Sequence, residues 1–215
     1  MKGLIPSLAT SAAVVTLICA QEPTGSSADA AQKYADIQKG YEVGQDTISP
    51  DGRFAILYPI REDMEETTAP NLLVRLKPYK VLKDFGESAW RGMRGEPDAN
   101  WSKDGRFVAV WHAKKWGNED LVVYEIANDQ IKREEKIWPE ILRYFGRGRK
   151  SDDAIGTFVN NDNDWLAFKD HKLFIKVSVD SQPNLVDGPH DTAELNGVWN
   201  LETAKFDKVD FKRGK

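Results

Sequence analysis

The sequence predicts a mainly β protein in which antiparallel sheets are built from about three similar hairpin units. Short apolar runs separated by turn residues follow one another from Tyr41 onward, which is typical of strands. A turn motif followed by an apolar strand recurs three times, and a second apolar strand follows each copy. Helix signals are confined to one or two short segments. The chain therefore reads as repeated hairpins and not as alternating strands and helices.

Residues 1–20 are predicted to be a cleaved secretory signal. Lys2 precedes an apolar stretch that ends in the small residue Ala20. A transmembrane anchor needs ~20 predominantly apolar residues, and Pro6 and several hydroxyl residues interrupt this stretch. We expect an exported protein, periplasmic or extracellular, whose mature chain begins near Gln21 and has no transmembrane segment.

Cys19 is the single cysteine, and it lies inside the predicted signal. A lipid-anchoring signal has a small residue before its cysteine, whereas Ile18 stands there, so lipid anchoring through Cys19 is disfavoured. Free cysteine also serves as an ordinary apolar residue. A mature chain without a thiol excludes disulfides, thiolate catalysis and cysteine metal sites.

One β-rich domain, residues 41–215, is expected to follow a tether and a short helix in residues 21–40. Residues 21–29 are rich in Gly, Ser, Pro and Thr, which is typical of a flexible tether. Residues 30–39 contain helix formers and precede Gly40, a helix stop. Loss of Lys2 with the signal leaves 29 basic residues against 34 acidic ones, a net charge of −5. This mild acidity gives no broad attraction to nucleic acid.

The recurring turn motif occupies residues 49–57, 102–111 and, in a degenerate copy, 160–168. The order Ser, Pro, Asp, Gly of the first copy fits a type I turn with glycine in the fourth place. Gly52 and Gly105 are therefore expected at positive φ, and Asn163 takes that place in the third copy. The run after each turn is apolar at consecutive positions, which predicts a strand buried on both faces.

The turn with its apolar strand resembles the blade repeat of TolB-like and WD-repeat-like β-propellers. The resemblance covers roughly residues 41–180 and implies blade-like sheets, but it implies no particular function. Propellers typically need 4–8 blades, and only three turn copies are present. Residues 193–209 form a further predicted meander without an Asp-Gly turn. Either this meander is a fourth blade that closes a small propeller, or the units pack as an open stack or sandwich.

A short helix is predicted at residues 138–145, between the second and third units. Pro139 suits a helix start, Glu140 stands in the first turn, and Gly146 follows as a stop.

The sequence holds few candidates for catalysis or metal binding. Its histidines are His112, His171 and His190, and none belongs to a His-Glu-x-x-His zinc pair. Asn160, Asp162 and Asp164 alternate like the start of a calcium loop, but the glycine and the final glutamate of that loop are absent. We therefore expect no metal and no cofactor.

Two groups of residues are candidates for binding. Trp111 and Trp116 follow the second unit's buried strand, and aromatic rings on loops can stack on sugars or peptides. A basic cluster follows the predicted helix and consists of Arg143, Arg147, Arg149 and Lys150. The structural alternative for the two tryptophans is packing between blades. The structural alternative for the basic cluster is a favourable interaction with the C-terminal end of the helix dipole.

These observations favour an exported, non-catalytic binding protein for an unknown protein or polysaccharide partner. The alternative is an extracytoplasmic hydrolase that uses carboxylates such as Asp104 or Asp162 for acid–base chemistry. This alternative is weaker because the turn aspartates already have a turn role and no paired-carboxylate spacing is apparent.

Overall fold

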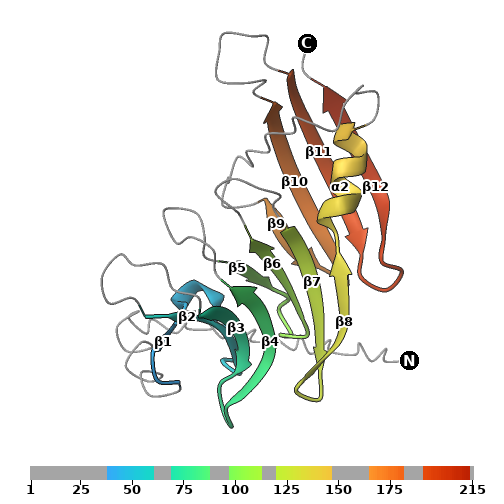
Figure 1. Ribbon diagram of the computed structural model, residues 1–215. Coiled ribbons are helices and arrows are strands. Elements are labelled where there is room, and N and C mark those ends of the chain that lie inside the picture. The colour runs from blue at the N-terminus through green and yellow to red at the C-terminus, as the bar shows by residue number, and fades with distance from the viewer. Residues whose placement is uncertain are drawn as a thin grey trace, which may run out of the picture.

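The computed structural model describes residues 38–60, 69–87, 97–112, 120–146, 165–181 and 191–213. In these residues the protein is mainly β, with three four-stranded antiparallel sheets and one short α-helix, α2 (Trp138–Gly146). The predicted fold class is therefore confirmed. The three sheets follow one another along the chain, from the blue strands through the green to the red in Figure 1.

Each sheet is a meander in which neighbours in sequence are neighbours in space. The first sheet contains β1 (Tyr41–Val43), β2 (Phe54–Pro59), β3 (Pro70–Arg75) and β4 (Lys80–Glu87), with a 3-10 turn η1 (Gln45–Thr47) after β1. The second contains β5 (Asp98–Trp101), β6 (Phe107–His112), β7 (Asp120–Ala127) and β8 (Gln130–Lys136). The third contains β9 (Leu166–Lys169), β10 (Lys172–Ser181), β11 (Asp191–Asn200) and β12 (Lys205–Arg213).

The first two copies of the turn motif take the same conformation. The amide of Gly52 donates to the carbonyl oxygen of Ser49 (2.8 Å), and that of Gly105 to Ser102 (2.9 Å). Gly52 has φ 67° and Gly105 has φ 66°, as predicted. In each copy the next strand, β2 or β6, is buried almost throughout on both faces, which is also as predicted.

Replacing Gly105 by valine is expected to destabilise the fold by ~1–2 kcal/mol, because a β-branched residue is strained in the left-handed region. Any Cβ at this position would also lie 3.1 Å from Oδ2 of Asp51 in the neighbouring sheet's turn. Urea unfolding measures the effect, and exposed Lys103 of the same turn, changed to valine, is the control. An unchanged midpoint for Gly105→Val would contradict the turn assignment.

The third copy of the motif does not occupy the same place in its sheet. The motif turns of the first two sheets connect the first and second strands, but residues 160–164 precede β9, the first strand of the third sheet. Asn163 lies outside the described residues. In the third sheet the first and second strands are joined by a tight hairpin at Asp170 and His171, both with positive φ (48° and 58°). β9 is accordingly a partly exposed edge strand, so the expectation that it is buried on both faces is wrong.

The predicted C-terminal meander exists as β11 and β12, but it is not a fourth blade. β11 pairs with β10 along its whole length, and β12 pairs with β11, so the two strands complete the third sheet. The unit could not be placed from its sequence because a meander that starts a sheet and one that ends a sheet have the same hydrophobic pattern.

Apolar clusters join the sheets in series. Alternate side chains of β2, including Phe54 and Ile56, meet Val108 and Tyr124 of the second sheet. The other face of the second sheet meets α2 and the inner face of the third sheet, where Leu173 and Leu195 are fully buried. No cluster of the described residues joins the first sheet to the third, so the described sheets form an open stack (Figure 1).

The helix α2 packs against the third sheet. It lies between the second and third sheets in the sequence, as predicted. Its buried residues Trp138, Ile141 and Phe145 follow one another at spacings of three and four, so they form one apolar stripe. Arg143 lies on the opposite, exposed side. In Figure 1 the helix runs alongside β11 and β12.

Polar contacts connect the sheets beside their apolar cores. Trp101 donates through Nε1 to the carbonyl oxygen of Thr47 (2.8 Å), and Lys83 pairs with Glu134 (2.8 Å), which ties the first sheet to the second. Arg133 of β8 donates to the carbonyl oxygens of Leu201 and Glu202 at the turn between β11 and β12. Directional contacts of this kind fix how neighbouring sheets are oriented.

The predicted helix at residues 30–39 lies almost wholly outside the described residues. Its last residues belong to a turn, since the amide of Tyr41 donates to the carbonyl oxygen of Gln38 (3.1 Å). Gly40 has φ 80° in this turn, which is the conformation expected of a glycine that ends a helix.

Candidate binding site

The two ends of the sheet stack differ in how the strands are connected. At one end the connections between first and second strands and between third and fourth strands are mostly tight turns, such as Asn128–Asp129 and the hairpin at Asp170 and His171. We call this the turn end. At the opposite end, which we call the open end, the longer connections run from Pro59 to Pro70, Glu87 to Asp98, His112 to Asp120, Gly146 to Leu166 and Ser181 to Asp191.

The turn end is held by its own hydrogen bonds. Ser49 donates through Oγ to Oδ1 of Asp51 (2.7 Å) and accepts from the amide of Phe54 (2.9 Å). Ser102 repeats both contacts with Asp104 (2.6 Å) and the amide of Phe107 (2.8 Å). The side chains of these turns are therefore engaged in structure, and they fix the start of the two most deeply buried strands.

The hydrogen bonds of Asp104 make its carboxyl group unsuited to general-acid catalysis. The Ser102 hydroxyl, which donates to the carboxylate, lowers the pKa of Asp104 despite its partial burial, and the amide of Arg106 acts in the same direction. A general acid at neutral pH needs a raised pKa instead. Asp162, the other carboxylate of the hydrolase hypothesis, lies outside the described residues.

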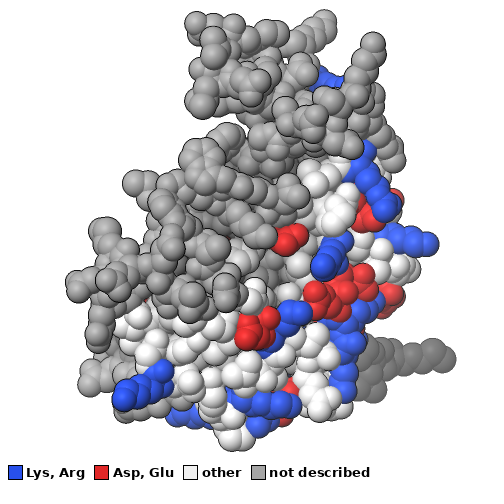
Figure 2. Space-filling view, viewed as in Figure 1, with Lys and Arg blue, Asp and Glu red and all other residues white. Residues whose placement is uncertain are grey.

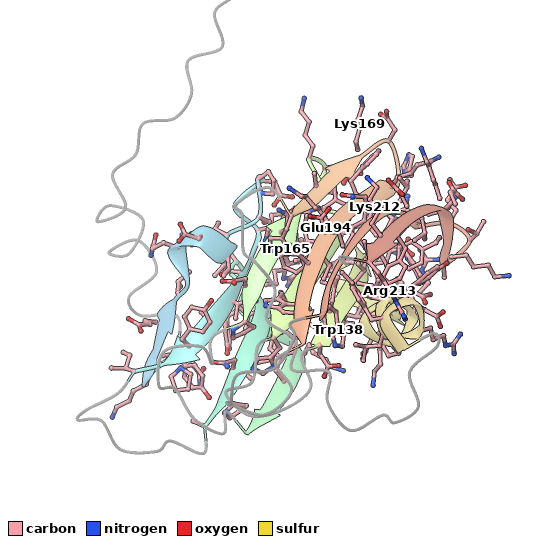
Figure 3. The ribbon with its side chains drawn as sticks, turned by 90° about the horizontal axis from the view of Figure 1, so that it is seen from above. Trp138, Trp165, Lys169, Glu194, Lys212 and Arg213 are labelled. Atoms are coloured by element: carbon pink, nitrogen blue, oxygen red, sulfur yellow. The ribbon has the colours of Figure 1, made fainter. Side chains whose placement is uncertain are left out.

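Trp111 lies in the core and not on a binding surface. Its side chain is 2% exposed, and its ring makes edge contacts with the rings of Trp138 and Trp165, both at 4.9 Å between centroids. The expectation that Trp111 binds a ligand is thus corrected, because its indole fills the seam between the second and third sheets. In Figure 3 Trp138 and Trp165 lie on the side of the third sheet that faces this seam. Trp116, the other tryptophan predicted to bind a ligand, lies outside the described residues.

Arg143 is the described member of the predicted basic cluster. Its side chain is 69% exposed and pairs with Glu140 one turn earlier (3.0 Å). Arg213 of β12 lies over the end of α2 in Figure 3 and donates to the carbonyl oxygen of Phe145 (3.4 Å). Positive charges near the C-terminus of a helix are favourable because they interact with the negative end of the helix dipole. Arg147, Arg149 and Lys150 lie outside the described residues.

Of the histidine and calcium-loop candidates, His112 and His171 belong to the described residues. Among the described residues no three His, Cys, Asp or Glu side chains are placed to hold a metal ion. Asn160, Asp162, Asp164 and His190 lie outside those residues. His112 ends β6, and His171 is exposed in its hairpin.

Sequence reasoning missed the exposed outer face of the third sheet. Phe174 is 40% exposed in the middle of β10, where it pairs with Val198, and an ion pair joins Lys172 to Asp207 nearby (2.9 Å). Glu194 and Lys212 are cross-strand neighbours on the same face (Figure 3). The signal was available, because Leu173, Ile175 and Val177 alternate with mostly polar residues along β10.

Charges of both signs are mixed on the described surface. In Figure 2 basic and acidic side chains lie next to one another over the strands of the second and third sheets. Arg106, Glu125 and Arg133 form a connected network there, with Arg133 Nε 3.3 Å from Glu125. This part of the surface lacks the single-sign stripe typical of nucleic-acid binding. Within the described residues no helix is long and apolar enough to span a membrane.

Comparisons with known proteins give one weak structural likeness. The sequence matches no family model and no curated protein. A chain from a structural and mechanistic study of two prolyl endopeptidases is similar at 10% sequence identity and a TM-score of 0.25. The similarity covers 82% of this chain and 37% of that one, so this chain spans a little over a third of the other protein's length. A likeness at this level carries no argument about function. The three four-stranded antiparallel sheets are themselves consistent with propeller blades.

Proposed function

We propose that the protein is an exported, non-catalytic binding module that holds a protein or polysaccharide partner at the open end of its sheet stack. The stack is the scaffold, and its three sheets are blade units related to those of TolB-like and WD-repeat-like propellers. Two observations support this relationship: all three sheets are four-stranded meanders, and two of them carry the same Ser–Asp–Gly turn between their first and second strands.

The contrast between the two ends is the observation that carries the proposal. At the turn end the side chains of Ser49, Asp51, Ser102 and Asp104 are committed to holding the turns. Five connections of seven or more residues emerge at the open end, whereas at the turn end only the connection from Val43 to Phe54 is as long. The side chains of Thr47, Ser49 and Asp51 in that connection are hydrogen-bonded within the first sheet. Loops placed on a rigid scaffold commonly carry recognition, and long ones are often functional. Two predicted binding residues, Trp116 and Arg147, belong to the connections at the open end.

Export is part of the proposal and rests on residues 1–20. Their charged start, apolar core and terminal small residue are the parts of a secretory signal. An extracytoplasmic location suits a domain that needs no thiol chemistry, since the single cysteine lies within the signal.

A hydrolase that uses carboxylates is the second candidate, and a specific observation disfavours it. The pKa of Asp104 is lowered by its hydrogen bond from Ser102, so this carboxylate is ionised at neutral pH and occupied by its turn. Turnover of a glycoside or peptide substrate by the purified protein would favour the hydrolase over the binding module.

Changing Trp116 and Arg147 together to alanine is expected to weaken partner binding at least tenfold while the unfolding midpoint stays near that of the wild type. Each residue is expected to contribute a contact, and loss of ~1.4 kcal/mol corresponds to a factor of ten. Calorimetric titration with a sulfated acidic polysaccharide and with a neutral glucan measures the affinity.

The matched control changes Tyr79 and Lys132, one exposed aromatic and one exposed basic residue at the turn end, to alanine. This variant removes the same charge and a similar ring, and it is expected to bind as the wild type does. Binding that survives the open-end change, or that is lost only in the turn-end variant, would contradict the proposal. Failure of both polysaccharides to bind would leave its polysaccharide form without support.

A further inference from the structure

The outer face of the third sheet is open to solvent over its described residues. Along β10 the buried side chains Leu173 and Ile175 flank Phe174, so Phe174 points to the other side of the sheet, where it is 40% exposed. Residues paired across neighbouring strands share a face, and the registers therefore place Ala167 and Val198 on either side of Phe174. This exposed ring thus has a strand on each side and does not lie at the margin of the sheet.

Lysines outnumber acidic residues on this face. The registers assign six lysines to it: Lys169, Lys172, Lys176, Lys205, Lys208 and Lys212. The acidic residues are Glu194 and Asp210, assigned in the same way, and Asp207, which pairs with Lys172 (2.9 Å). The face therefore carries a net charge of +3, and since the whole chain carries −4, the rest of the chain carries −7. Asp170 and Glu202 belong to the hairpin turns at the end of the sheet and not to its face.

Three of these lysines surround the exposed ring. Lys172 and Lys176 stand two residues before and after Phe174, about 7 Å away along the strand. Lys208 is the partner of Val198 and lies two strands, or about 10 Å, from Phe174. Lys169 and Lys212 extend the basic surface on the side of the sheet opposite Trp138 (Figure 3). The face is therefore one aromatic ring within a field of long cationic side chains.

The charge and shape of the face disfavour several kinds of occupant. A second copy of the chain applied through the same face would bring like charges together, which opposes association. A further blade would need an apolar face like those that join the described sheets. A linear polyanion such as single-stranded nucleic acid is commonly held in a basic groove, whereas the side chains of an open sheet face project from one layer.

An anionic lipid bilayer matches both the charge and the shape. Four strands of ten residues cover an area about 14 Å wide and about 33 Å long, and a flat bilayer offers headgroup phosphates to all the lysines of such a surface at once. Lysine side chains lay their stems along apolar surface while their amines reach phosphates, and aromatic rings favour the interfacial region. Anionic leaflets attract clusters of basic residues. The same field turns the acidic remainder of the chain away from the membrane.

We propose that the outer face of the third sheet docks the protein on an anionic phospholipid bilayer, with its lysines at the headgroup phosphates and Phe174 in the interfacial region. Attachment of this kind is peripheral and sensitive to salt, because it depends on a modest net charge and one ring. The proposal goes beyond the partner-binding function and is independent of it. The docking face lies on the flank of the stack, so the connections at the open end stay uncovered.

Sedimentation with lipid vesicles tests the attachment. The chain from Gln21 onward is used, because the apolar residues 1–20 would themselves bind lipid. Vesicles of phosphatidylglycerol and phosphatidylcholine in equal parts should bind the protein several-fold better than vesicles of phosphatidylcholine alone, and added salt should release it. Absence of binding, or equal binding to both kinds of vesicle, would overturn the proposal.

Two variants with the same change of charge identify the docking face. The first removes three exposed charges from the outer face by changing to glutamine Lys169, Lys205 and Lys208. We expect its vesicle affinity to be at least about tenfold lower, since each basic residue near an anionic surface strengthens binding. The matched control changes to glutamine three exposed lysines of the second sheet and its motif turn, Lys103, Lys132 and Lys136. The control should bind nearly as the wild type does, and equal losses in the two variants would contradict docking through this face.

A fluorescent label reports the contact at Phe174. The chain from Gln21 onward has no cysteine, so Phe174→Cys provides a single attachment site for an environment-sensitive dye. Its emission should shift to the blue on anionic vesicles, whereas the same dye at Tyr79→Cys, an exposed position at the turn end of the first sheet, should emit as in the free protein. Unshifted emission at position 174 of vesicle-bound protein would show that another surface meets the lipid.

Dextran sulfate distinguishes a soluble polyanion from a bilayer. If the variant of Lys169, Lys205 and Lys208 loses affinity for dextran sulfate while the wild type does not bind anionic vesicles, the face holds soluble polyanions and the lipid proposal is wrong. These results are separable from the partner-binding proposal, which is tested in the absence of lipid with Trp116 and Arg147.

Discussion

Replacing Trp138 by alanine is expected to lower the free energy of unfolding by about 3–5 kcal/mol, the usual range for removing a large buried ring. Trp138 is 2% exposed and begins α2 at the seam between the second and third sheets. Its ring meets that of Trp111 edge-on, with 4.9 Å between centroids, and belongs to the cluster that joins the two sheets. Urea unfolding measures the effect as a lower midpoint with an unchanged slope.

Tyr79→Ala is the control for this change, because its ring is 37% exposed at the turn end. Surface substitutions of this kind usually stay within about 0.5 kcal/mol. A Trp138 variant that unfolds with the wild-type midpoint would mean that α2 and the third sheet do not share a core with the second sheet.

Replacing Phe54 by alanine is expected to cost a similar amount, about 3–5 kcal/mol, and tests the other seam. Phe54 is 1% exposed and stacks on Trp101 of the second sheet, with 5.9 Å between centroids and 16° between planes. Because Phe54 belongs to the apolar cluster that joins the first and second sheets, we expect thermal unfolding of the variant to remain a single transition at a lower temperature.

Phe174→Ala is the matched control, since this phenylalanine is 40% exposed on the outer face of the third sheet. Its unfolding temperature should stay close to the wild-type value. Two well-separated transitions in the Phe54 variant would show that the first sheet folds apart from the rest, which is the opposite of what the shared cluster implies.

Much of the fold was predictable because its determinants are local. Gly52 and Gly105 are at positive φ where the turn spacing requires it, and β2 and β6 are buried on both faces as their unbroken apolar runs indicate. The helix α2 begins beside Pro139 and ends at Gly146, which are helix start and stop signals.

The parts that could not be predicted depend on contacts between distant residues. The third turn copy precedes the first strand of its sheet and not the second, and no local feature of residues 160–168 distinguishes these positions. β11 and β12 complete the third sheet because they pair with β10, and strand pairing is set by packing of whole faces.

The candidate site was predicted less well than the fold. Trp111 carries the same aromatic signal whether it fills a seam or faces solvent, and only its contacts with Trp138 and Trp165 place it in the core. The exposed face around Phe174 was not predicted, because the sequence pattern of β10 does not show which side of the third sheet another sheet covers.

Hydrogen exchange of the protein with and without a bound polysaccharide tests the central claim most directly, because it locates the partner on the unmodified chain. Partner binding at the open end predicts slower exchange in peptides that contain Ile60, His112 and Asp120, while peptides that contain Gly52, Gly105 and Asp129 exchange as before. Protection confined to the turn end, with exchange at the open end unchanged, would contradict the account.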